Sequence, residues 1–161
     1  MDIEKCIKEG FLKTVTPSKE AQRKEMDSAY YDLKRAEASS EDHDYKWSII
    51  QSYYAIFHSA RALLDSMGYR EKRHFAVGVV LEELAKNKKI NVRLVSDFHA
   101  AMSAREDADY RDTYSKETSD YMVEISEEFV KEIKGILSNK NESKNGNKKQ
   151  KAKEEETEND A

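Results

Sequence analysis

Apolar residues recur three and four positions apart through most of this chain. Because such positions share one face of a helix, the spacing predicts amphipathic helices. The stretch 47–67 differs, since apolar residues occupy almost every side of it. A helix of that kind belongs in the middle of a bundle, in contact with several neighbours. Its polar side chains, Gln51, His58, Arg61 and Asp65, then need partners, because burying an unpaired polar group is costly.

Turn and capping residues divide the chain into helical segments. Thr16 and Pro17 begin the long second segment, Asp42 or Asp44 caps the central helix, and Gly68 ends it. We expect helices over 3–12, from 17 to about 40, from about 44 to 67, from 75 to 86–89, from 92 (capped by Asn91) through 102 with a continuation that puts Arg105 and Asp109 on the same face, and over 115–137, with a basic loop at 69–73. The predicted fold class is therefore all-α, an up-and-down bundle of about five helices.

The helical pattern stops after Leu137. Residues 139–161 contain six lysines and six acids and no aliphatic residue except alanine. Such a segment cannot bury enough apolar surface to offset the entropy lost on ordering. We predict one domain over 1–138 and a disordered, charged, low-complexity tail over 139–161.

Composition narrows the protein's class. A chain of 161 residues with one proline and 37% charged residues fits a single helical domain. The net charge of −4 does not indicate a nucleic-acid-binding protein, although a local basic patch is compatible with it. Cys6 is the only cysteine, which excludes an internal disulfide and suits a reducing compartment. Without an apolar run of ~18 residues or a signal-like N-terminus, we expect a cytoplasmic protein with no membrane partner.

The candidate chemistry lies in two polar clusters. The four histidines lack metal-ligand spacing and the glycines form no phosphate loop, so we expect no metal and no cofactor. The clusters are Arg70–His74, after the central helix, and Ser103–Arg111, in which Arg105 and Asp109 stand four residues apart and can pair. Taken alone, each cluster is more often a solvated loop or a structural ion pair.

Three elements in a fixed order resemble one family. They are the run Ser52–His58 (SYYAIFH) followed by Ala60–Leu64 (ARALL), then Gly68-Tyr69 and Arg73-His74, and finally Arg105-x-x-Ala108-Asp109-Tyr110. Together they resemble the HEPN domains, and more narrowly their small single-domain prokaryotic branch, over roughly residues 17–137.

The resemblance implies a helical bundle that forms two-fold homodimers. It also implies a minimal nucleotidyltransferase as partner, in a toxin–antitoxin-like pair. Catalytic HEPN domains are metal-independent ribonucleases whose motif is an arginine followed four to six residues later by a histidine. Arg105 matches that arginine, but Tyr110 stands at the position of the histidine.

Metal-free RNA cleavage needs a general base and acid, for which histidine is suited near neutral pH. Arginine stabilises a phosphate but is not a base, and tyrosine is a poor one. Three functions stay open. The first, which we favour, is a dimeric module that binds a partner, nucleotide or RNA through Arg105, Asp109, Arg73 and Arg61. The second is a ribonuclease toxin using Arg105 with His74 or Tyr110. The third is a structural helical adaptor.

Overall fold

The protein is a helical bundle with a small two-stranded sheet at one side. The structure, a computed structural model, describes the backbone of residues 1–159 and the side chains of residues 1–153. Its elements are α1 (Ile3–Lys8), β1 (Leu12–Thr14), α2 (Lys19–Glu41), α3 (Tyr45–Ser66), β2 (Tyr69–Glu71), α4 (His74–Lys86), α5 (Val92–Tyr110) and α6 (Lys116–Asn159). The all-α prediction is confirmed.

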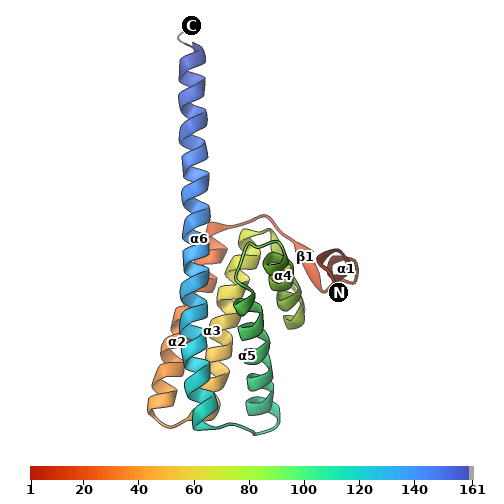
Figure 1. The fold of residues 1–161 in the computed structure, drawn as a ribbon, viewed down its shortest axis with the longest axis vertical. Helices are drawn as coiled ribbons and strands as arrows, with labels where there is room; N and C mark the ends of the chain where they lie inside the picture. Colours follow the sequence, from red (N-terminus) through yellow and green to blue (C-terminus); the bar gives the residue numbers. More distant parts are fainter. Residues whose placement is uncertain (160–161) are drawn as a thin grey trace.

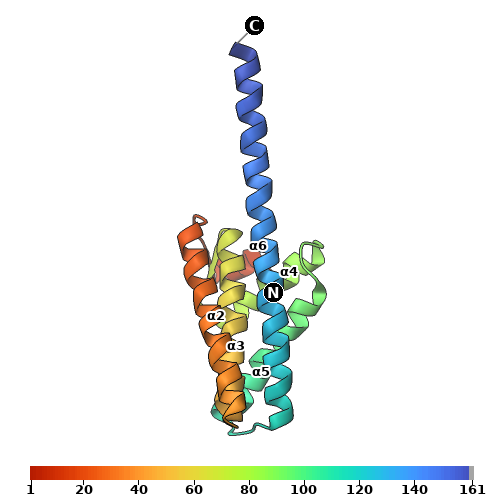
Figure 2. The ribbon, with the colours of Figure 1, turned by 90° about the vertical axis from the view of Figure 1, so that its left-hand side faces the viewer.

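Helix α3 lies at the centre of the bundle, as its all-round apolar pattern predicts. It packs against α2, α5 and α6, which run alongside it (Figures 1 and 2), and it also contacts α4. Tyr53, Ile56, Leu63 and Leu64 of α3 are at most 1% exposed. Within the described residues, no helix is both long and apolar enough to cross a membrane.

Three predicted helix boundaries are confirmed, and the predicted start of α2 is wrong. Asp44, rather than Asp42, caps α3 by accepting from the Trp47 amide. Asn91 caps α5, and Gly68 ends α3 with a φ of +85°. Thr16, however, does not cap α2. Ser18 does, because its Oγ accepts from the Ala21 amide, so Pro17 precedes the helix instead of standing in its first turn.

The pair of strands corrects two further predictions. The helix predicted over 3–12 ends at Lys8, and the predicted basic loop after α3 is strand β2 over most of its length. Strands β1 and β2 pair antiparallel, with Leu12 opposite Glu71. Gly10, at φ +76°, turns the chain from α1 into β1, a backbone conformation that suits glycine. The pairing joins segments almost sixty residues apart, which a local hydrophobic period does not reveal.

Helix α6 continues beyond the bundle as a projecting rod (Figure 1), where the sequence predicts a disordered tail. The side chains of residues 142–153 are exposed, so tertiary packing does not support the helix there. Because isolated helices of this length are marginal in water, disorder in solution remains our prediction. Residues 160–161 of the predicted tail lie outside the described residues.

Truncation of the chain after Ser138 should leave its melting temperature nearly unchanged. The truncation removes the hydrogen bond that the Lys140 ammonium donates to Ser66 O at 3.2 Å in a part-buried position. A bond of this kind contributes about 1 kcal/mol. Differential scanning calorimetry of both chains measures the shift, and a drop of more than about 5 °C would mean that the tail stabilises the bundle.

Candidate functional site

Arg105 lies at the centre of a cluster of tyrosines between α3 and α5. Its guanidinium carbon is 5.6 Å from the ring centroid of Tyr53, 5.8 Å from that of Tyr54 and 5.0 Å from that of Tyr110. Its Nη2 donates to Tyr54 Oη at 3.3 Å and lies 3.3 Å from Asp109 Oδ2. The ion pair expected from the i, i+4 spacing is therefore present. Arg105 Nε is buried and has no hydrogen-bond partner among the described residues.

Tyr53 connects this arginine to the histidine of the other sequence cluster. The Tyr53 ring faces Arg105, and its hydroxyl lies 3.0 Å from His74 Nδ1. The His74 ring also packs against Phe57, with centroids 4.3 Å apart, while its remaining surface is exposed at the start of α4. The fold thus brings Arg105 and His74, which belong to different elements of the sequence motif, to one aromatic ring.

The surroundings of His74 favour its neutral form. Burial lowers the pKa of His74, and the positive charges of Arg105 and Arg61 lower it further, against the opposing effect of Glu71. Burial also raises the pKa of Tyr53 far above its usual range, so its hydroxyl keeps its proton. Near neutral pH the pair is therefore an uncharged imidazole hydrogen-bonded to a protonated phenol.

A network of acids and bases lies beside the tyrosine cluster. His58 Nδ1 is 2.7 Å from Glu25 Oε2, and His58 Nε2 is 3.6 Å from Asp32 Oδ2. Arg61 pairs with Glu71 at 2.7 Å and with Glu25 at 3.5 Å. These contacts join α2, α3 and β2, and they provide the partners that the sequence required for two polar residues of the central helix.

The other two polar residues of α3 are also paired. The Gln51 side-chain amide is hydrogen-bonded to Ser39 Oγ at 2.7 Å. Asp65 Oδ1 accepts from the Ser18 amide at 2.9 Å and from Gln22 Nε2 at 3.0 Å. Neither residue reaches the tyrosine cluster through these contacts. Both hold α2 against α3, which is a structural role.

The structure brings together most, though not all, of the residues proposed from sequence. Arg105, Asp109 and Tyr110 form one cluster, and His74 joins it through Tyr53. The guanidinium of Arg61 is already paired with two carboxylates. Arg73 stands at the N-cap of α4, where its exposed side chain makes no hydrogen bond or ion pair with any described residue.

The sequence did not predict the roles of Tyr53 and Tyr54 in the tyrosine cluster, or that of Glu71 in the network beside it. Tyr53 and Tyr54 belong to the motif that carries the family resemblance, but the motif alone assigns them no role of their own. Glu71, expected in a solvated loop, is buried and holds Arg61. Two adjacent tyrosines in an apolar helix could have indicated an aromatic site. The burial of Glu71, in contrast, depends on the strand pairing, which the sequence pattern does not reveal.

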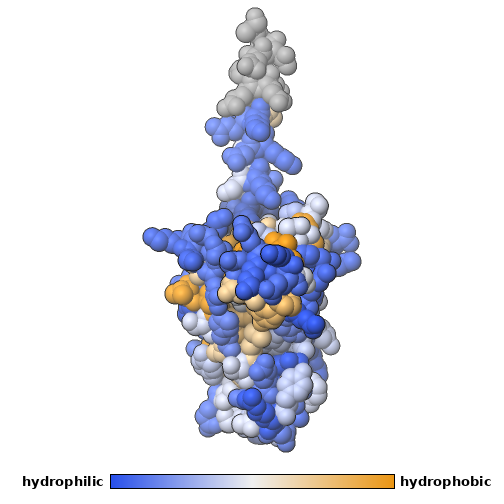
Figure 3. Space-filling view, turned by 90° about the vertical axis from the view of Figure 1, so that its right-hand side faces the viewer, coloured by the Kyte–Doolittle hydropathy of each residue, from blue (hydrophilic) through white to orange (hydrophobic). Residues whose placement is uncertain are grey.

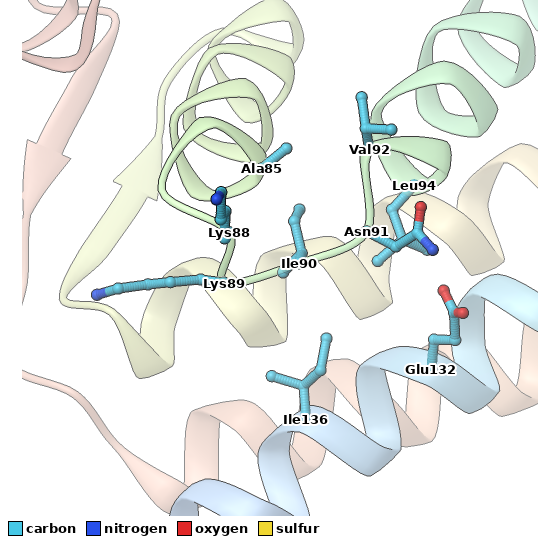
Figure 4. Close-up of a pocket in the computed structure, with 9 residues that line it drawn as sticks. All are labelled: Ala85, Lys88, Lys89, Ile90, Asn91, Val92, Leu94, Glu132 and Ile136. Carbon is cyan, nitrogen blue, oxygen red and sulfur yellow. The ribbon is translucent and has the colours of Figure 1, made fainter.

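A broad hollow of about 570 Å³ lies elsewhere, between the α4–α5 turn and α6. Ile90, Leu94 and Ile136 form its apolar floor, and Lys88, Lys89 and Glu132 stand at its edges (Figure 4). None of the residues proposed from sequence lines it. Over the described residues, no group of three His, Cys, Asp or Glu side chains is placed to hold a metal ion.

Comparison with known proteins supports the family suggested by the motif. A family model described as the HEPN domain matches residues 23–136, a span that runs from α2 into α6 and includes Arg105, Tyr53 and His74. The chain therefore belongs to the HEPN domain family. It is also similar to a protein of Methanocaldococcus jannaschii named "Putative toxin MJ0142", with 28% identity over 100 residues that cover 60% of this chain and 68% of that protein.

Proposed function

We propose that this protein is a toxin-like HEPN domain that forms a homodimer in the cytoplasm and binds a phosphate of RNA or of a nucleotide at Arg105, without cleaving it. A minimal nucleotidyltransferase is the partner we propose, on the strength of the family. The observation that carries the proposal is the state of Arg105, whose guanidinium is positioned by three tyrosines and whose Nε lacks a partner among the described residues.

Arg105 suits phosphate better than it suits a purely structural pair. Its contact with Asp109 involves one nitrogen at 3.3 Å, and its side chain is 16% exposed. A guanidinium held in this way keeps donors available for a phosphate, which it can bind bidentately. Tyr110, 71% exposed, lies over the same guanidinium and offers a stacking surface to a base or ribose.

The hydrogen bond between Tyr53 and His74 favours binding over cleavage. Tyr53 is 1% exposed. Among the described residues, its hydroxyl has His74 Nδ1 as its hydrogen-bond partner. A buried hydroxyl donates its proton where an acceptor exists, so Nδ1 accepts and the neutral imidazole carries its proton on Nε2. In this tautomer His74 offers a hydrogen-bond donor to a phosphate instead of a base to a 2′-hydroxyl.

Replacement of Arg105 by alanine tests the site. We expect binding of ATP and of a labelled oligoribonucleotide to weaken about 5- to 150-fold, equivalent to ~1–3 kcal/mol for the removal of a charge-assisted hydrogen bond. Isothermal titration calorimetry at two salt concentrations measures the change. Arg111→Ala is the matched control, because Arg111 is exposed and pairs only with Asp107 among the described side chains. Unchanged binding in a folded Arg105→Ala protein would contradict the proposal.

Cleavage is the second candidate, and one observation favours it, namely the approach of His74 and Arg105 to the same tyrosine. The assay for it is the same oligoribonucleotide incubated in EDTA, followed by electrophoresis. We expect intact RNA. Cleavage that disappears in both Arg105→Ala and His74→Ala would establish the ribonuclease instead.

The dimer is tested by light scattering at micromolar concentration. Trp47 and Tyr31 are 51% and 67% exposed in the single chain. Large exposed aromatics of this kind are enriched at interfaces. We expect about twice the chain mass of 18.7 kDa, and a mass of one chain would contradict the dimer.

A further inference from the structure

The face of α6 that packs against the bundle carries a row of lysines where the helix extends beyond the bundle. Phe129 and Ile133 are fully buried against the bundle. Further along the same helix stand Lys140, Lys144, Lys148 and Lys151. At 3.6 residues per turn, these four lysines fall within roughly 80° of one another around the helix axis. In the helix these four lysines therefore form a basic stripe on one face, while Lys149 and Lys153 lie on the opposite face. The six lysines stand within fourteen residues, so the segment keeps its positive charge beside the bundle in a disordered form as well.

Lys140, the first lysine of the stripe, forms no ion pair with a carboxylate of the described residues. It donates to Ser66 O at 3.2 Å and to Ser66 Oγ at 3.4 Å, which are neutral acceptors at the C-terminal end of α3. Burial lowers the pKa of Lys140, and the like charges of Lys144 and Lys89 lower it further. No carboxylate among the described residues pairs with it. The lysines here repel one another, so an anion would relieve the repulsion.

Two hollows meet at this point. One, of about 130 Å³, is lined by Lys19, Lys140 and Lys144 together with Pro17, Gln22, Ser66, Leu137 and Asn141. The other, of about 440 Å³, is lined by Lys89, Lys140, Lys144, Ile136, Asn139 and Ser143. We call the four lysines Lys19, Lys89, Lys140 and Lys144 the lysine collar. The smaller hollow has the volume of about four water molecules, which is enough for one phosphate group.

The composition around the collar favours an anion that carries phosphate groups. Residues 138–153 hold a single acid, Glu142, and the rest are mostly lysine, asparagine, serine and glutamine. These are the side chains that contact phosphate oxygens in nucleic-acid complexes. No aromatic residue stands among them to stack a base. The described part of the projecting rod presents a hydrophilic surface above the bundle (Figure 3).

We propose that the lysine collar, continued by Lys148 and Lys151, binds the phosphodiester backbone of a nucleic-acid strand without regard to sequence. Each lysine neutralises a phosphate and releases its counterions, so binding depends strongly on salt. The acidic run that begins at Glu154 follows these lysines in the sequence, and its negative charge should oppose the binding of a phosphodiester strand. This site is separate from Arg105, and the inference holds whether or not Arg105 binds phosphate.

The test measures binding of a labelled 20-nucleotide oligouridylate to the full chain by fluorescence anisotropy, at several salt concentrations. The variant K144Q/K148Q/K151Q retains Lys140 and its hydrogen bonds to α3. We expect at least a tenfold weaker affinity at 50 mM salt, and a salt slope smaller by about 2, as expected when three phosphate contacts with a single strand are removed. Removing residues 154–161 should tighten binding at least threefold.

The matched control is K5Q/K8Q/K34Q, which removes three lysines on α1 and α2 and should change the affinity less than threefold. The stripe variant should weaken binding by the same factor in an Arg105→Ala background, which separates this site from the tyrosine cluster. Equal affinities of stripe and control variants, or no binding by the wild type, would overturn the proposal. So would poly-L-glutamate binding as tightly as the oligonucleotide, which would point to an acidic protein.

Discussion

Phe98→Ala should destabilise the bundle by about 3–5 kcal/mol, the range for a fully buried phenylalanine. Phe98 is 0% exposed on α5, and its ring stands 3.5 Å from where a side chain at Gly78 of α4 would begin. Truncation would therefore leave a cavity between two closely packed helices. The melting temperature should fall by roughly 6–20 °C in calorimetry, given the heat of unfolding of a domain of this size.

Phe75→Ala is the control for this substitution. Phe75 lies on α4, is 41% exposed and makes one edge-on contact with Phe11 at 5.1 Å. Removing that contact and a partly buried ring should cost only about 1 kcal/mol. If both variants were destabilised to a similar extent, Phe98 would not be packed tightly between α4 and α5 in solution.

Glu25→Gln should lower the free energy of unfolding at pH 7 by about 1.5–3 kcal/mol, the range for hydrogen bonds to charged groups. Glu25 bonds to His58 and lies near Arg61, and its side chain is 14% exposed. Burial acts to raise the pKa of Glu25, but the His58 hydrogen bond and the charges of Arg61, His58 and Arg70 outweigh it and lower the pKa below 4.5.

The lowered pKa fixes the sign of the pH dependence. In the unfolded chain Glu25 gains its proton near pH 4.5, whereas in the folded protein it does so at a lower pH. The stabilisation is therefore complete above pH 4.5 and disappears as the pH falls through the folded-state value. Denaturant unfolding between pH 3 and pH 7 should show a steeper acid destabilisation for the wild type than for Glu25→Gln.

Glu20→Gln provides the comparison on the same helix. Glu20 is 69% exposed and pairs with Lys24 at 3.5 Å, a surface contact of i, i+4 spacing. Such pairs contribute at most about 0.5 kcal/mol. We expect this variant to follow the wild type at every pH. If Glu25→Gln did the same, the network around His58 would not hold α2 to α3 in solution.

The hydrophobic pattern was sufficient to predict the bundle, the central position of α3, and the pairing of Arg105 with Asp109. These features depend on periods of three and four residues, and such periods arise from the geometry of a single helix. Capping was local too, but Thr16, Pro17 and Ser18 offered competing starts for α2. The helix begins after Ser18, whose amide also donates to buried Asp65.

The rest of the site depends on how the elements pack together. The sheet pairs Leu12 with Glu71, which buries Glu71 and provides the partner of Arg61. Tyr53 of α3 meets His74 at the start of α4 and Arg105 of α5, so its role depends on three elements at once. The lysine collar likewise forms where α6 passes the ends of α2 and α3. Contacts between distant segments produce no periodic pattern in the sequence, because the spacing of residues within one helix or strand depends only on the geometry of that element.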